Sequence, residues 1–193
     1  MEGNIMIAQI KLKLASFLFF SRNINAARQI IEIRRQTFGE FIFRGYTELD
    51  ADAIAELYRQ LNGGAVFSRV QRKLYRHIGK RCLFVVEQKD TLGSSKIVAM
   101  NMYYLNRKDV RENTIHEGFI GVVPEVGGQG IATKMRQMAV EQFRASGFSG
   151  ISTRISLDNT ASIVSAQKIG FQTVEEYEEP STGEQRYYMI CKF

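Results

Sequence analysis

The sequence has little of several residue types, and each shortage excludes a class of protein. Its 193 residues include two cysteines, Cys82 and Cys191, which are too few for a disulfide scaffold or a cysteine-rich zinc site. There are also only two histidines, so we expect no metal centre. Two prolines and 11% aromatic residues favour a dense core built from regular elements.

The chain also lacks an apolar run long enough to span a membrane. The longest run, from Ile5 to Phe20, is interrupted by Lys11 and Lys13 and falls short of the ~20 residues that a spanning helix needs. Glu2 stands where a secretory signal would carry basic residues. The composition, 45% hydrophobic and 24% charged, is that of a folded protein, and the length suits one main domain. We therefore expect a reduced, cytoplasmic protein.

The net charge of +6 is unevenly distributed. Residues 1–38 carry six basic and two acidic residues, and residues 59–81 carry seven basic residues and no acidic one. Acidic residues gather again at Glu175–Glu179. This segregation indicates an anionic ligand or surface. A nucleic acid is not expected to be that ligand, because the basic face of the helix in this run has no interleaved aromatic residues for base stacking. That face is formed by Arg69, Arg72, Lys73, Arg76 and Lys80.

The hydrophobic periodicity predicts an α/β (α+β) fold. Strands are expected at 41–46, 83–87, 97–105, 115–123, 151–157, 172–177 and 185–193, and helices at 50–62, 66–78, 131–147 and 159–170. A turn is expected at Asp90–Ser95 and a polar loop at Asn106–Asn113. In the second helix Val66, Val70, Leu74 and Ile78 are expected to face the core. The order predicts one mixed central sheet with helices on both faces.

Residues 1–38 form an extension before this pattern. Ile10, Leu12 and Leu14 alternate with polar residues, which predicts a strand, and the segment Ile24–Arg34 predicts a helix. Three roles are open for this basic and apolar segment. The first role is to cover an exposed part of the sheet, the second is to form an arm in a homodimer, and the third is to lie on an anionic membrane surface.

A glycine-dense turn between a strand and a helix carries the strongest chemical signal. The segment Val122–Thr133 reads VVPEVGGQGIAT. Free backbone N–H groups at the start of a helix form a site for phosphate oxygens. Neither the P-loop nor the dinucleotide-binding pattern fits this spacing. Taken alone, the glycines are also explained by a tight strand-to-helix turn.

This segment resembles the pyrophosphate-binding signature of the GNAT superfamily of acyl-CoA N-acyltransferases, V-x-P-x-x-[RQ]-G-x-G-[IL]-[GA]. Gly127 stands where the signature has Arg or Gln. A second signature, N-x-x-[AS]-I-x-x-Y-x-K-x-G-F, is similar to the segment Asn159–Phe171, with Ala166 in the place of the Tyr. The resemblance extends from about Phe41 to Phe193, and we expect residues 39–193 to form the GNAT-like domain.

The resemblance implies a V-shaped splay between the strands that end near Val123 and Leu157. Acetyl-CoA, or another acyl-CoA, would lie in this opening as the cosubstrate, with no metal. The residues implied to bind it are Val122, Val123, Gly127, Gly128, Gln129, Gly130, Ile131, Ala132, Thr133 and Asn159.

An amine acceptor must lose a proton to attack a thioester, and the strand before the loop offers two candidate bases, His116 and Glu117. Counting back in twos from Val122 places His116 on the face of Val122 and Glu117 on the face of Phe119. The alternative is that both are ordinary polar residues near the start of a strand, with no catalytic role. At Ala166 the general acid that the family places near the thiolate is missing.

The sequence thus predicts an acyl-CoA-dependent N-acetyltransferase, acting on an amine of a small molecule or a protein by direct attack in a ternary complex. Two alternatives keep the same fold. One is transfer of a longer acyl chain, and the other is a catalytically silent acyl-CoA-binding regulatory domain. The basic run favours an anionic acceptor and the acidic cluster a cationic one, so the charge of the acceptor stays open.

Overall fold

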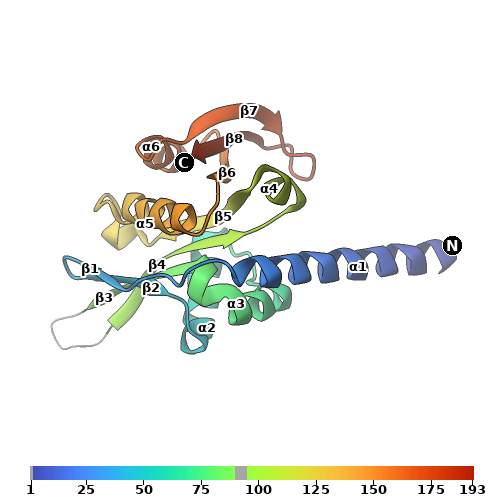
Figure 1. Ribbon diagram of the computed structural model, residues 1–193, viewed down its shortest axis with the longest axis horizontal. Helices are drawn as coiled ribbons and strands as arrows, with labels where there is room; N and C mark the ends of the chain where they lie inside the picture. Colours follow the sequence, from blue (N-terminus) through green and yellow to red (C-terminus); the bar gives the residue numbers. More distant parts are fainter. Residues whose placement is uncertain (1, 90–94) are drawn as a thin grey trace.

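A computed structural model describes residues 2–89 and 95–193, and places the helices and strands as follows (Figure 1). The helices are α1 (Glu2–Ala27), α2 (Ala51–Leu61), α3 (Arg69–Cys82), α4 (Arg107–Glu112), α5 (Ile131–Ala145) and α6 (Thr160–Gln167). The strands are β1 (Gln36–Phe38), β2 (Phe41–Gly45), β3 (Leu83–Lys89), β4 (Ser95–Tyr104), β5 (Thr114–Val122), β6 (Gly150–Ser156), β7 (Gln172–Glu178) and β8 (Gln185–Lys192). The turn expected at Asp90–Ser95 lies, except for Ser95, outside the described residues.

All eight strands form one sheet in the order β1-β2-β3-β4-β5-β6-β8-β7. Every neighbouring pair is antiparallel except β5 and β6, which are parallel. The crossover between these two strands is α5, as parallel pairing requires a long connection. The expected mixed sheet is confirmed.

Helices cover both faces of the sheet, with α5 on one side and α1, α2 and α3 on the other (Figure 1). Adjacent residues of β4 show this alternation, because Tyr103 packs on Phe143 of α5 whereas Tyr104 packs on Phe19 of α1. The expected inward face of α5 is confirmed, since its apolar side chains are buried. They are Ile131, Met135, Met138 and Phe143.

The extension differs from its prediction. Instead of a strand, residues 2–27 form the long helix α1, and residues 28–35 run without regular structure. From residue 4 to residue 38 the sequence contains neither glycine nor proline, so neither of the strongest helix breakers interrupts this helix. The short alternation at Ile10–Leu14 was therefore the weaker signal. The boundary expected after residue 38 falls in the hairpin turn between β1 and β2.

Two further elements correct the prediction. The helix expected at 66–78 begins at Arg69, because the Ser68 hydroxyl accepts the Gln71 N–H and caps it. Val66 and Val70, expected in the core, are 77% and 49% exposed, whereas Leu74 and Ile78 are buried as expected.

The expected loop at 106–113 contains the short helix α4. Asn106 caps it by accepting the N–H groups of Lys108 and Asp109, and the Asp109 carboxylate accepts the N–H of Asn106 in return. This reciprocal cap shows why a polar stretch of this length is helical.

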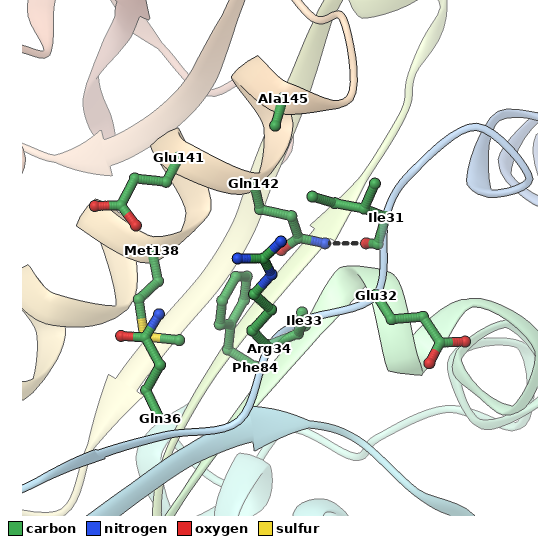
Figure 2. Close-up of a pocket in the computed structure, with 10 residues that line it drawn as sticks. All are labelled: Ile31, Glu32, Ile33, Arg34, Gln36, Phe84, Met138, Glu141, Gln142 and Ala145. Carbon is green, nitrogen blue, oxygen red and sulfur yellow. Dashed lines mark hydrogen bonds between the residues drawn. The ribbon is translucent and has the colours of Figure 1, made fainter.

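The segment after α1 is held against α5 and the end of α3 (Figure 2). The Gln142 side chain donates to the carbonyls of Ile31 and Arg81, at 2.6 and 2.9 Å. Arg81 in turn donates to the carbonyl of Ile30 at 2.9 Å. A cavity of about 180 Å³ remains between this segment, Phe84 and Met138. These bonds fix the chain that leads from α1 into β1.

Among the helices within residues 2–89 and 95–193, none is both long enough and apolar enough to cross a membrane. The same residues contain no group of three or more His, Cys, Asp and Glu side chains arranged to hold a metal ion.

Candidate functional site

A cleft opens where β5 and β6 stop pairing. The two strands pair in parallel from Thr114 and Gly150 to Glu117 and Thr153. Both strands continue beyond that point, to Val122 and Ser156, without further pairing to each other. The expected splay is therefore present, with its vertex at Glu117.

The larger of two cavities at this splay has a volume of about 450 Å³. It is bounded by the end of β5, the glycine turn, the start of α5 and the start of α6. Its lining comprises Leu61, Ile120, Gly121, Val122, Val126, Gly127, Gly128, Gly130, Ile131, Ala132, Thr133, Arg136, Asn159, Ala161, Ser162, Val164, Ser165 and Lys168. Two sequence motifs that lie 29 residues apart, from Gly130 to Asn159, thus meet at one cavity.

The glycine turn carries unused hydrogen-bond donors beside this cavity, which all its residues from Gly127 to Thr133 line except Gln129. The Gly127 N–H donates to Pro124 and the Lys134 N–H to Gly130. Between them, the N–H groups of residues 128–133 have no acceptor among the described residues. Six N–H groups at the positive end of the α5 dipole make this turn suited to a phosphate or pyrophosphate.

Two glycines of the turn are required by its backbone. Gly128 and Gly130 have φ of +76° and +78°, a region that other residues adopt only with strain. Gly127 is different, because its φ is −59° and a Cβ there would lie 3.0 Å from the Pro124 carbonyl oxygen. A side chain at position 127, where the family signature has Arg or Gln, would therefore be crowded by this carbonyl, and glycine avoids the contact.

Asn159 lies between the two cavities of the splay. Its side-chain oxygen accepts the Ser162 N–H at 3.1 Å and caps α6. Asn159 also lines both cavities of the splay.

The second cavity, of about 260 Å³, lies beyond the vertex on the side of β6 and β8. Its charged lining residues are Glu117, Arg136, Arg154, Glu184 and Arg186. Arg136 lines both cavities, so a single guanidinium stands between them.

A one-residue bulge in β5 sets the direction of the candidate bases. Met102 pairs with Phe119 and Tyr103 with Glu117, which leaves Gly118 without a partner. The bulge reverses the alternation of side chains below it.

As a result, Glu117 lies on the face of Ile120 and Val122, and His116 lies on the face of Phe119. Counting in twos through Gly118 gave the opposite assignment and was wrong. Contacts agree with the observed faces, because Glu117 bonds to Arg136 of α5.

Glu117 is held by a buried ion pair. Its carboxylate oxygens accept from Nε and Nη2 of Arg136, with the shortest distance 2.9 Å, and both side chains are 1% exposed. The guanidinium also donates to the carbonyl and hydroxyl oxygens of Ser162, at 2.9 and 3.0 Å. This network ties β5, α5 and α6 together at the vertex.

Sequence reasoning missed Arg136, although a signal was present. At 100° per residue it lies within about 20° of Phe143 on the α5 helical wheel, and Phe143 is among the residues expected in the core. A cation on the buried side of a helix requires a partner, and Glu117 is the acid that the structure supplies.

His116 belongs to a separate buried network. The Ser152 hydroxyl donates to Asp109 at 2.7 Å and lies 2.8 Å from His116 Nδ1. Because the hydroxyl has one hydrogen, His116 donates from Nδ1 to Ser152. Burial lowers the pKa of His116 to about 4, against the raising effect of the nearby Asp109 charge. His116 lines neither cavity of the splay.

Ala166, at the expected position of the general acid, is fully buried in α6. The neighbouring Ser165 hydroxyl does line the larger cavity, 3.3 Å from the Thr133 hydroxyl. Two closing-strand tyrosines that could replace the acid, Tyr187 and Tyr188, line neither cavity.

Comparison with known proteins gives one family. Residues 51–171 match the Acetyltransferase (GNAT) family, and this range covers both motifs and four of the eight strands of the sheet. A search of curated proteins gave no match.

Solved structures share the fold at low sequence identity. A chain of the NatC complex bound to Gag peptide and CoA has a TM-score of 0.68 and 13% identity, over 80% of this chain and 99% of that one. yncA from Salmonella typhimurium, solved with its cofactor acetyl-CoA, has a TM-score of 0.63 and 16% identity, over 80% and 94%. The ribosomal-protein-S18-alanine N-acetyltransferase from Escherichia coli has a TM-score of 0.60 and 15% identity, over 79% and 93%.

Proposed function

Because the chain belongs to the Acetyltransferase (GNAT) family, we propose that it transfers an acetyl group from acetyl-CoA to an amine of a small molecule or a protein. The observation that supports this proposal best is the cavity of about 450 Å³ that collects the glycine turn, the start of α5 and Asn159. Similar structures were solved with acetyl-CoA or CoA, which supports the choice of cosubstrate.

The proposed site binds the pyrophosphate at the N–H groups of residues 128–133, which have no acceptor among the described residues. Acetyl-CoA supplies the acyl group as a thioester. We place its pantetheine arm along Val122, at the end of β5 where the edge facing β6 is unpaired. Val123, also expected to bind it, is buried and its N–H donates to the Val98 carbonyl of β4 at 2.9 Å. Asn159, which lines both cavities, would contact this arm.

The acceptor amine is placed in the second cavity, beside the vertex. An amine with a pKa near ~10 is mostly protonated at neutral pH, so a base must take its proton. Glu117 is the proposed base, directly or through one water, because it lines this cavity and His116 does not. Arg136 is a positioning residue that fixes the Glu117 carboxylate. The amine nitrogen then bonds to the acyl carbon, the C–S bond breaks and CoA leaves as a thiolate. The second proton that the nitrogen loses passes to this thiolate or to water.

A thermal-shift measurement tests the cofactor site. A ligand that binds only the folded protein at a hundredfold excess over its Kd stabilises it by about 2.7 kcal/mol. Acetyl-CoA should therefore raise the Tm by several degrees. Gly130→Glu, which puts a carboxylate at the phosphate position, should abolish this rise.

Gly183→Glu is the matched control. Gly183 also has a positive φ, +69°, and open space around a Cβ, but it lies in the turn between β7 and β8. Both variants carry the same strain and the same charge, and only Gly130→Glu should lose the response to acetyl-CoA. An equal response in the two variants would remove the turn from the cofactor site.

Acyl transfer is tested by thiol release from acetyl-CoA across a panel of amines. Glu117→Gln should lower kcat/KM by ~10²-fold or more near pH 7, with a smaller deficit at high pH where the amine is already neutral. His116→Gln should not. The reverse result would make His116 the base. Faster turnover of longer acyl-CoAs would favour the longer-chain alternative, and binding without turnover of any amine would favour a silent domain.

A further inference from the structure

The described side chains in the first half of α1 are exposed. Helix α1 extends away from the sheet and from the other helices (Figure 1). Its last third is anchored to the rest of the protein. There Asn23 is fully buried, donates to the Leu105 carbonyl at 3.0 Å and accepts the Leu105 N–H at 2.7 Å. Phe19 and Phe20 pack on Tyr104 and His77.

In the projecting part, six of the seven large apolar residues between positions 6 and 18 fall on one side of the helix, and Leu12 falls outside that side. Six large apolar residues between positions 6 and 18 are 41–67% exposed. They are Met6, Ile7, Ile10, Leu14, Phe17 and Leu18. At 100° per residue they span an arc of about 120° on the helical wheel. We call these six residues the apolar stripe.

Charge around the apolar stripe has one sign. Lys13 lies about 20° beyond one edge of the stripe and Lys11 about 20° beyond the other, and both are exposed. From residue 3 to residue 31 the sequence contains no Asp or Glu. The stripe is therefore bordered by cations on both sides, with no acid on the same helix after Glu2.

This pattern of apolar and basic residues distinguishes two partners that could cover the apolar stripe, a second copy of α1 and an anionic membrane. A second copy of α1 would bring lysines toward lysines, and the positions that repeat at coiled-coil spacing, Ile7, Ile10, Leu14 and Phe17, cover only about two heptads. A bilayer with anionic lipids accepts the apolar stripe between its acyl chains and attracts the lysines at its headgroups.

We propose that α1 binds the surface of an anionic phospholipid membrane, lying in the interface with the apolar stripe inserted. The anchored end of the helix holds the acetyltransferase domain at that surface. This inference rests on α1 alone and is independent of the proposed acyl transfer.

Vesicle co-sedimentation with the full chain tests the proposal. Vesicles of phosphatidylcholine with about 30% phosphatidylglycerol should pellet the protein at low salt, and pure phosphatidylcholine vesicles should pellet at least about tenfold less. Ile10→Glu with Phe17→Glu should abolish binding, and Lys11→Glu with Lys13→Glu should weaken it about tenfold or more. These positions are exposed, so the Tm should not change.

Leu49→Glu with Val66→Glu is the matched control, because it introduces the same charges at exposed apolar residues outside α1. This variant should bind vesicles like the wild type. Light scattering of the protein in solution measures its oligomeric state and so detects the alternative, a dimer formed through α1. Absence of vesicle binding, loss of binding in the control, or a dimer that Ile10→Glu with Phe17→Glu dissociates without any vesicle binding would each overturn the proposal.

Discussion

The ion pair between Glu117 and Arg136 should dominate the stability of the vertex. Both side chains are 1% exposed, so removing one partner leaves a buried charge without its counterion. Breaking such a pair costs about 3–5 kcal/mol. For a protein of this size, 1 kcal/mol corresponds to roughly 2–4 °C in Tm. We therefore expect Arg136→Met or Glu117→Gln to lower the Tm by about 10 °C.

A double-mutant cycle followed by urea unfolding measures the coupling. Glu117→Gln with Arg136→Met removes both charges, so its cost should be smaller than the sum of the single variants by about 2 kcal/mol or more. Asp52→Asn, which breaks the exposed pair with Arg72 at 3.0 Å, should leave the unfolding midpoint unchanged within error. Additive single costs, or single costs as small as that of Asp52→Asn, would refute the reasoning.

Three more outcomes follow from burial and close packing. Because the folded pKa of His116, about 4, lies below its unfolded value near 6.5, its stabilising effect is complete above pH 6.5 and is lost as the pH falls toward 4. The free energy of unfolding should therefore fall by up to about 3 kcal/mol more in the wild type than in His116→Gln over that range, and equal pH dependences would exclude this role. Burial raises the pKa of the Cys82 thiol to about 12, so a disulfide exchange reagent such as DTNB should label Cys82 only after unfolding; rapid labelling of the native protein would contradict its burial. Gly150→Ala places a Cβ 2.6 Å from the Cys191 carbonyl oxygen between β6 and β8 and should cost about 1–3 kcal/mol in urea unfolding, whereas an unchanged midpoint would mean that the strands separate freely.

Most of the sheet and the helix that follows the glycine turn could be predicted from the sequence, because their apolar residues recur with a single period. Prediction failed where a local device changed the outcome. The side-chain cap at Ser68 moved a helix start, and the cap at Asn106 created one. In α1, three apolar residues that alternate with polar ones resembled a strand, although no breaker interrupts the helix.

The cofactor turn was recognisable because its chemistry lies in consecutive residues. The vertex was not, since its parts are far apart in the chain. Glu117 and Arg136 meet only after the parallel crossover, and the direction of Glu117 depends on one bulged glycine, Gly118. Periodicity counts residues and cannot detect an unpaired one, so it reversed the two candidate bases.

The strand order has a consequence for the time at which the site can exist during synthesis. Strands β1 to β5 are neighbours in the chain and in the sheet, so they can pair as they emerge. β6 pairs with β8 along its whole length, and β8 lies between β6 and β7 although it is synthesised last. A nascent chain that ends before Gln185 already holds every residue that lines the larger cavity. It still lacks β8, the strand that pairs with β6 beyond Thr153, where β5 no longer does, and so holds the segment that leads into α6. Because α6 lines the cavity, the C-terminal strand, which contributes nothing to that lining, completes it.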